Sequence, residues 1–225
     1  MNFSIDEIDK LNYNQLIGIV EETNRPPGGI KTILHFINYS NIKNNSKILE
    51  IGTSTGFTAI EIAKRIDCEI VAIDINKDSL KIAEDRAKKY DVHDKIKFSQ
   101  ENAMNLSFED EEFNFVFSGN ILSYIPEREK ALKEYMRVLK PGGVLFAVPM
   151  YYKKIPSDVF FEKICNALKM EITVDTENYW NNFFNVKSLD KFLAEKYEFD
   201  YIKNKEIQNF VDEIFEYHNN EIKKK

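Results

Sequence analysis

The arrangement of short apolar runs in the middle of the chain constrains the fold more than any other feature of the sequence. Each run is short enough for a strand, and the runs alternate with stretches whose apolar residues recur at helical spacing. They lie at Lys47 to Ile51, Ile70 to Ile75, Ile96 to Ser99, Phe113 to Ser118 and Val144 to Pro149. Such alternation is typical of βαβ units, in which the strands are parallel and helices cover both faces of the sheet. The sequence therefore predicts an α/β fold, with a mainly parallel, twisted sheet inside a three-layer α-β-α sandwich.

The helices between these runs have recognisable ends. Asn76 is suited to cap a helix that carries Leu80 and Ala87, because its short side chain can accept hydrogen bonds from backbone N–H groups. A second helix is predicted from Pro126 to Leu139, with the proline in its first turn, and it should stop at Pro141 to Gly143. Helices in these places provide the crossovers that a parallel sheet requires.

The chain before the first strand is predicted to form a helical cap, which we assign to residues 1–45. Apolar residues recur at helical spacing in Leu16 to Val20 and again in Ile30 to Ile37. Between them, Arg25 to Gly29 contains two prolines followed by two glycines, a combination that cannot continue a helix. We therefore expect two helices joined by a loop that could act as a lid.

The sheet-forming core is assigned to residues 46–150, and residues 151–225 are expected to complete the same domain, because 225 residues suit a single domain. The aromatic run from Tyr179 to Phe184 shows no clear periodicity and is expected to be an insertion on the substrate side. The other elements expected there are helices at Ser157 to Leu168, Ser188 to Tyr197 and Ile207 to Tyr217, and a closing strand at Phe199 to Ile202.

Composition excludes several classes of protein. The net charge of -6 argues against binding nucleic acid by bulk electrostatics, because such binding depends on clustered lysine and arginine. The two cysteines, Cys68 and Cys165, lack the short spacing of a metal site, so we expect no metal and reduced thiols. The first residues do not resemble a secretory signal, and no apolar run approaches the roughly 20 residues that span a bilayer. We expect a cytoplasmic protein without membrane insertion, either a monomer or a homodimer.

The turn after the first predicted strand is the segment that points to chemistry. In an open α/β sheet, ligands bind beyond the carboxyl ends of the strands, and glycines in the first strand-to-helix turn let the backbone approach the ligand. This turn contains Gly52 and Gly56. The dinucleotide pattern G-x-G-x-x-G, started at Gly52, requires two further glycines where this chain has Ser54 and Phe57. A NAD-dependent oxidoreductase is therefore a disfavoured alternative.

The stretch Ile48 to Gly56 resembles the first motif of class I S-adenosylmethionine (SAM)-dependent methyltransferases, usually written E/D-x-G-x-G-x-G, with Ser54 in place of the middle glycine. Further pieces of that family pattern follow in register over residues 46–150. They are a second strand that ends in an acid (Val71 to Asp74), the turn after the third strand (Glu101 to Leu106), the fourth strand (Phe113 to Ser118), and Arg137 to Leu145, which resembles the ubiquinone and menaquinone methyltransferase group. The resemblance implies a Rossmann-like methyltransferase fold with SAM as cofactor and S-adenosylhomocysteine as product.

The resemblance also implies roles for individual residues. Asp74 would accept hydrogen bonds from both ribose hydroxyls, and Asn102 would accept one from the adenine amino group. Glu50 would orient the turn or meet the amino group of the methionine part. The positions expected to bind the cofactor are Glu50, Gly52, Thr53, Ser54, Gly56, Asp74, Ile75, Asn102, Ala103, Met104 and Ser118. As alternatives, an acid at a strand end can be a helix cap, and Asn102 can be a turn residue.

Methyl transfer from a sulfonium is an in-line displacement with a good leaving group, so such an enzyme mainly aligns the acceptor and excludes water. If the acceptor must lose a proton, the candidate general bases are Tyr13, Glu22, His35 and Tyr124, although His35 lies among apolar residues that favour a packing role. The candidates for the acceptor side are Asn120, Tyr124, Tyr151 and Trp180, of which the aromatic residues could instead belong to the core. We expect a small, apolar or aromatic acceptor.

Two alternative functions share the same glycine turn. A protein of this fold could transfer another part of SAM, such as an aminopropyl group, or could bind SAM without transferring anything. The by-product separates these reactions, because methyl transfer leaves S-adenosylhomocysteine and aminopropyl transfer leaves methylthioadenosine.

Overall fold

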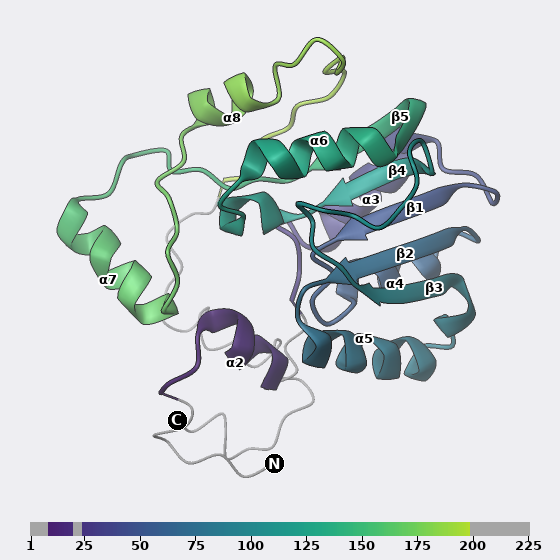
Figure 1. The fold of residues 1–225 in the computed structure, drawn as a ribbon, viewed down its shortest axis with the longest axis horizontal. Coiled ribbons are helices and arrows are strands. Elements are labelled where there is room, and N and C mark those ends of the chain that lie inside the picture. The colour runs from purple at the N-terminus through teal and green to yellow at the C-terminus, as the bar shows by residue number, and fades with distance from the viewer. Residues whose placement is uncertain (1–8, 20–23, 199–225) are drawn as a thin grey trace.

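The computed structural model describes residues 9–19 and 24–198, and a five-stranded sheet forms its centre (Figure 1). All neighbouring strands are parallel, in the order β3-β2-β1-β4-β5. The strands are β1 (Lys47–Ile51), β2 (Glu69–Asp74), β3 (Ile96–Gln100), β4 (Phe113–Ser118) and β5 (Leu139–Ala147). The predicted α/β fold with a parallel sheet is confirmed. Because the chain builds outward from β1 in both directions, the strand order reverses between β1 and β4, which is where such sheets bind ligands.

Helices cover both faces of the sheet, so the three-layer arrangement is also confirmed. One face packs against α3 (Ile30–Ser40), α4 (Phe57–Ala63) and α5 (Lys77–Lys89). The other face packs against α6 (Arg128–Val138), α8 (Glu177–Phe183) and the 3-10 helix η2 (Asn120–Tyr124). The remaining helices are α2 (Tyr13–Ile19), α7 (Asp158–Leu168) and the 3-10 helix η1 (His93–Lys95).

Burial on both faces explains why the central strands β1 and β2 are mostly apolar. Successive side chains of a strand point to opposite faces, so Ile48 enters the core beneath α3 and α4 while Leu49 enters the core beneath α6. Ile70 and Val71 of β2 divide in the same way. A strand with one solvated face alternates with polar residues, as the edge strand β3 does with Lys97 between Ile96 and Phe98.

Strand β5 begins five residues before the predicted start at Val144 and includes Pro141 to Gly143. These residues form an irregularity in the pairing with β4, whose register shifts between Phe113 and Phe115. A Cβ atom at Gly143 would lie 2.8 Å from the Asn114 carbonyl oxygen, so a glycine is needed for the chain to stay against β4. Proline and glycine are tolerated in such bulges, and the predicted turn is therefore part of the strand.

Helix α6 also differs from its predicted bounds, because it starts at Arg128 rather than at Pro126. Ile125 has extended backbone angles, as the residue before a proline usually does, and it closes η2 by donating its N–H to the Leu122 carbonyl. Pro126 thus separates η2 from α6 rather than opening α6. The helix ends at Val138, and β5 follows without a loop.

The helix predicted at Ser188 to Tyr197 is absent, and this prediction was wrong. The segment makes a turn at Val186–Leu189 and then runs without regular secondary structure. Glu195 and Tyr197 both contact His35 of α3, with Nδ1–Oε2 and Nδ1–Oη distances of 2.5 and 2.6 Å. Residues two apart share one side of an extended chain but not of a helix, so these tertiary contacts require an extended backbone.

The predicted helix at Ser157 to Leu168 is confirmed as α7, which Ser157 caps by accepting the Phe160 N–H. The aromatic run after Tyr179 forms α8, capped by Thr176. The predicted strand at 199–202, the predicted helix at 207–217 and Val20 lie outside the described residues. The division of the chain at residues 45 and 150 stays a prediction.

Candidate cofactor site

The turn between β1 and α4 lies at the carboxyl ends of the strands, which point toward the side of the molecule where α2 and α7 lie (Figure 1). The N–H groups of Gly52 and Thr53 both donate to the Ile73 carbonyl at 2.9 Å, which ties the turn to β2. Gly52, Ser54 and Gly56 all have positive φ angles, of 76°, 50° and 85°. The turn therefore needs left-handed backbone at three of five successive residues, and glycine supplies it at two of them.

The packing of the protein itself requires both glycines. A Cβ atom at Gly52 would lie 2.9 Å from the Ile121 side chain of η2. A Cβ atom at Gly56 would lie 2.8 Å from the Ala83 Cβ, where α4 and α5 meet. The sequence suggested these glycines for approach to a ligand, and the structure adds a reason that does not depend on one. Their presence alone is therefore weaker support for a ligand than the sequence implied.

Asp74, the last residue of β2, reaches the glycine turn. Its Oδ2 accepts the Ser54 N–H at 2.8 Å, and its Oδ1 accepts the Asn76 N–H at 2.9 Å. Burial raises the pKa of this carboxyl group, and backbone N–H groups of Asn76, Ser54 and Ile75 oppose that rise. Asn76 in turn caps α5 by accepting from Asp78 and Ser79, as its position in the sequence predicted. The side chain most expected to hold a ribose therefore lies directly beside the turn.

Glu50 points away from the turn opening and toward the start of α4. Its side chain is buried, and Oε2 accepts the Thr53 hydroxyl at 2.7 Å. Burial raises its pKa to about 7, while hydrogen bonds from the Thr53 and Thr58 side chains and the Ala59 N–H oppose the rise. Of the two roles considered for Glu50, this geometry favours bracing of the turn over direct contact with a ligand.

On the expected adenine side, Asn102 follows β3 and forms a turn of its own. Its Oδ1 accepts the Met104 N–H at 2.9 Å, so one acceptor position of the amide is occupied within the turn. Ala103 and Met104 pack against the core beneath α6. Ile75, next to Asp74, has 70% of its surface exposed, so a large apolar side chain lies open beside the carboxylate. The adenine-binding roles of these residues stay predictions.

After β4, the chain places Asn120 and Tyr124 together on η2. The Asn120 Oδ1 accepts the Ser123 hydroxyl at 2.7 Å and the Met150 N–H at 3.0 Å, which joins η2 to the chain leaving β5. Burial raises the pKa of Tyr124, and a hydrogen bond with the Asn120 side chain opposes the rise. Ser118 is fully buried in the core, so its side chain has no access to the turn opening.

The loop between α2 and α3 lies against this end of the sheet. A Cβ atom at Gly119 would lie 3.6 Å from Pro26, and the Arg25 guanidinium lies 5.4 Å from the centre of the Phe57 ring at the start of α4. Helix α2, which carries Tyr13, lies beside the start of α5 (Figure 1), where Gly18 faces Ser79. The predicted lid loop thus lies near the glycine turn, and its movement stays a prediction.

The other aromatic and basic candidates have different surroundings. Trp180 is 4% exposed and donates its Nε1 hydrogen to the Met150 carbonyl at 2.9 Å, so it is a core residue rather than an open pocket wall. Tyr151 packs against the same core. His35 contacts Tyr197 and Glu195 on the outer side of α3, and none of its contacts is a residue of the turn. The fourth base candidate, Glu22, lies outside the described residues.

Sequence reasoning missed a buried ion pair that the structure places behind η2. Arg128 of α6 donates to Asp175, between α7 and α8, at 2.7 Å, and both side chains are less than a tenth exposed. The partner is 47 residues away. The one available signal was the position of Arg128 in the first turn of a helix, where the helix dipole disfavours a cation.

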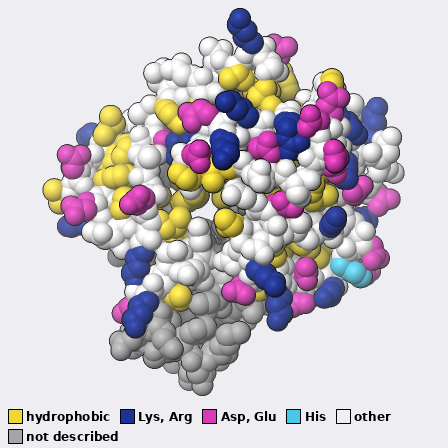
Figure 2. All heavy atoms as spheres, in the orientation of Figure 1, with side chains coloured by type: hydrophobic (Ala, Val, Ile, Leu, Met, Phe, Trp, Pro, Cys, Tyr) yellow, Lys and Arg dark blue, Asp and Glu magenta, His cyan; other side chains and the backbone are white. Residues whose placement is uncertain are grey.

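The surface carries no extended region of one charge on the face shown in Figure 2, where acidic and basic side chains are intermingled. Apolar side chains gather over α7, where Ile155, Val159 and Phe160 are each more than half exposed. Within residues 9–19 and 24–198, no group of three potential metal ligands occurs. No helix in the same part of the chain is both long and apolar enough to cross a membrane.

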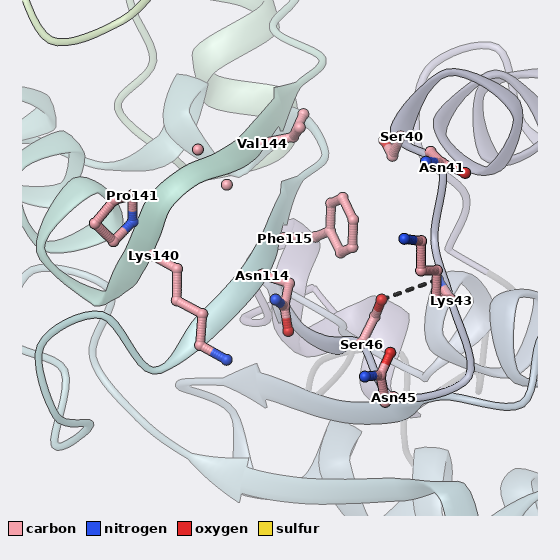
Figure 3. Close-up of a pocket in the computed structure, with 12 residues that line it drawn as sticks. Ser40, Asn41, Lys43, Asn45, Ser46, Asn114, Phe115, Lys140, Pro141 and Val144 are labelled. Atoms are coloured by element: carbon pink, nitrogen blue, oxygen red, sulfur yellow. Dashed lines mark hydrogen bonds between the residues drawn. The ribbon is translucent and has the colours of Figure 1, made fainter.

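A hollow of about 420 Å³ lies at the amino ends of the strands, away from the glycine turn (Figure 3). The end of α3, the chain leading into β1, the start of β4 and the bulge of β5 form its walls, with Phe115 in the centre of the view. Because ligands of open α/β sheets bind beyond the carboxyl ends of the strands, this hollow at the amino ends is separate from the candidate cofactor site.

A parallel sheet with the order 3-2-1-4-5, a glycine turn after its first strand and an acid at the end of its second strand define the class of α/β proteins that bind a nucleoside-containing cofactor at this turn. Residues 48–143 match the methyltransferase domain family. The chain belongs to the class I SAM-dependent methyltransferases.

Individual relatives agree with this membership. An uncharacterized protein of Haemophilus influenzae is 30% identical over 83% of this chain and 76% of its own length. The demethylmenaquinone methyltransferase of Staphylococcus carnosus is 28% identical over 79% of this chain and 76% of its own length. Among solved structures, the MccD protein is 29% identical and superposes with a TM-score of 0.75 over 88% of this chain and 87% of that one.

Proposed function

We propose that the protein binds SAM at the turn after β1 and transfers its methyl group to a small acceptor by in-line displacement. The observation that carries the proposal is the contact between the Asp74 carboxylate and the Ser54 N–H at 2.8 Å. An ionised carboxylate has about four acceptor positions, and the Ser54 and Asn76 N–H groups occupy one on each of its two oxygens. The remaining positions suit the two hydroxyls of a ribose, so the residues present fit the cofactor.

Each part of the site would hold a different part of SAM. Asp74 would hold the ribose, the backbone from Gly52 to Gly56 the methionine part, and the turn from Asn102 to Met104 the adenine. When bound, SAM supplies a methyl group on a positively charged sulfur. Glu50 braces the turn from below, and η2 with the Pro26 loop would exclude water from the opening.

The acceptor side favours a nucleophile that needs no protein base. Burial raises the pKa values of Tyr124 and Tyr152, so both phenols stay protonated near neutral pH and can donate hydrogen bonds. A general base must instead accept a proton. We therefore propose that Tyr124 orients the acceptor and does not deprotonate it.

The names of relatives support a small, apolar acceptor. The Staphylococcus carnosus protein is named for demethylmenaquinone, and the sterol 24-C-methyltransferase of Candida albicans is 29% identical over 80% of this chain. This chain spans about half of the length of the sterol enzyme, so we do not assign a sterol substrate to this chain. We assign the wall of the acceptor site to Tyr124 of η2 and to Tyr151 and Tyr152, which follow β5.

The alternatives to methyl transfer, which are transfer of another part of SAM and SAM binding without transfer, still have to be tested, because the fold alone does not fix the reaction. The [4+2]-cyclase SpnF shares the fold, with a TM-score of 0.55 and 24% identity over 59% of this chain and 49% of that one. SAM binding and methyl transfer must therefore be tested separately. Incubation with SAM and candidate acceptors should yield S-adenosylhomocysteine, and methylthioadenosine would refute methyl transfer.

Calorimetry with SAM, S-adenosylhomocysteine and NADH tests the cofactor assignment. We expect SAM and S-adenosylhomocysteine to bind and NADH not to bind. Asp74→Ala should weaken SAM binding roughly a hundredfold, because two hydrogen bonds to a charged group are lost. Asp78→Ala, which removes an exposed acid four residues away, is the matched control. Equal SAM affinity in both variants would remove Asp74 from the proposed site.

A further inference from the structure

Arg128 lies at the centre of a network that no motif of the sequence marks. Its Nη1 donates to the Asp175 carboxylate at 2.7 Å. Its Nη2 donates to the Ser123 carbonyl at 3.1 Å and to the Thr173 hydroxyl at 2.7 Å, and this hydroxyl donates in turn to Asp175 at 2.9 Å. One guanidinium therefore joins the start of α6, the end of η2 and the linker between α7 and α8.

Aromatic and backbone contacts close this network into a ring. The guanidinium carbon lies 4.9 Å from the centre of the Trp180 ring, within cation–π range. Trp180 donates to the Met150 carbonyl, and the Met150 N–H donates to Asn120 of η2. The Asp175 carbonyl accepts the Tyr152 N–H at 2.9 Å, which adds the chain after β5. Every segment of the proposed acceptor wall is thus linked to Arg128.

The network reaches the cofactor turn through η2. The Ile121 side chain lies so close to Gly52 that a Cβ atom there would be 2.9 Å away. Ser123, which Arg128 holds, is two residues further along the same 3-10 helix. A change in the position of η2 would therefore alter both the wall of the turn opening and the place of Tyr124.

We propose that Arg128 is a positioning residue, which holds η2 against the glycine turn and thereby shapes the site for cofactor and acceptor. Where the inference concerns ligands, it rests on the proposed function. A buried ion pair is often no more stabilising than an apolar pair of similar size. The planar fork of arginine, in contrast, fixes several acceptors in defined directions, which lysine or an apolar side chain cannot do.

The test separates positioning from stability with two variants. Arg128→Met leaves the buried Asp175 carboxylate without its cationic partner and should lower stability. Arg128→Met combined with Asp175→Leu replaces the pair with apolar side chains and should recover most of that stability. Positioning predicts that η2 stays loosened in both variants. If η2 is then ordered only about a tenth of the time, the dissociation constant of SAM rises roughly tenfold in both.

Hydrogen exchange of the η2 amides from Ile121 to Ile125 provides a readout that does not require SAM. Exchange should accelerate in both variants and stay unchanged in the control Val138→Ala, which removes buried apolar volume at the far end of α6. If Arg128→Met fails to fold, Arg128→Lys takes its place in the experiment. This variant keeps the positive charge but not the planar guanidinium, and it should also accelerate exchange. Trp180 is the single tryptophan, so its fluorescence reports whether each variant keeps the cluster packed.

The outcomes distinguish this inference from the proposed function. Accelerated exchange in η2 with recovered stability in the double variant supports positioning by Arg128. Wild-type exchange and wild-type SAM affinity in the double variant would show that Arg128 serves stability alone and would overturn the inference. Failure of the unmodified protein to bind SAM refutes the proposed function, while the exchange data still decide whether Arg128 positions η2.

Discussion

Glu50 is a carboxylic acid whose ionisation the fold disfavours. It is 3% exposed beneath the glycine turn, and burial raises its pKa from its ordinary value of 4.5 to about 7. The hydrogen bonds from Thr53, Thr58 and Ala59 oppose this rise without cancelling it. Replacement of the carboxylate by a neutral group of the same shape, Glu50→Gln, removes the cost of the charge and keeps the packing.

The sign and size of the effect follow from this pKa. Between pH 4.5 and pH 7 the folded chain keeps a proton on Glu50 that the unfolded chain has released, so the free energy of unfolding falls as pH rises through this window. It stays at the lower level above about pH 7. The difference between 4.5 and about 7, at 1.36 kcal/mol for each pH unit, gives a loss of about 3 kcal/mol.

Urea denaturation of the wild type and of Glu50→Gln at several pH values from 4.5 to 8 measures this loss. The stability of the variant relative to the wild type should increase by up to about 3 kcal/mol across the range. Glu84→Gln, at an exposed position on α5, is the matched control and should follow the wild type. A constant difference between Glu50→Gln and the wild type would show that Glu50 ionises normally in the fold, and the reasoning from burial would be wrong.

Three further predictions concern the turn and the thiols. Gly56→Ala should lower the free energy of unfolding by about 2–4 kcal/mol, because the new side chain combines left-handed backbone with a 2.8 Å approach to Ala83. Thermal or urea denaturation measures this loss. A loss below about 1 kcal/mol would contradict the geometry. Ser54→Gly should change the free energy of unfolding by less than about 1 kcal/mol and keep SAM binding. The reason is that φ of Ser54 is already 50° and that its backbone N–H makes the contact with Asp74. A larger loss of stability in denaturation, or a loss of SAM affinity in calorimetry, would assign a role to the hydroxyl. Burial raises the pKa of Cys68 to about 11, so at pH 8 a thiol reagent should label the less buried Cys165 and spare Cys68 in the folded protein. Mass spectrometry of the labelled peptides identifies the labelled cysteine. Rapid labelling of Cys68 would count against its burial.

Local pattern was enough for the elements around the sheet. The start of β1 at Lys47, the bounds of β4 and the cap at Asn76 agree with prediction because each depends on residues within a few positions. The start of β5 shows where such reasoning fails. Pro141 to Gly143 look like a turn in isolation, and pairing with β4 draws them into the strand.

The candidate site was predicted in outline only. Asp74 and the glycine turn lie side by side because parallel strands β1 and β2 end at the same edge, a consequence of the strand order. The sequence could not show that Gly52 and Gly56 face Ile121 and Ala83, since these contacts depend on how η2 and α5 pack. It likewise could not tell whether Trp180 was a core residue or a pocket wall.

By itself, the sequence determined the alternating α/β pattern, the place of the cofactor turn and the family, because these are recorded in periodicity and in short motifs. Only the tertiary structure decided that Arg128 meets Asp175, that Glu195 and Tyr197 reach His35, and that the charge of Glu50 is disfavoured. These features depend on burial and on contacts between distant segments. Such properties arise only when the layers pack together, and no single stretch of the chain contains them.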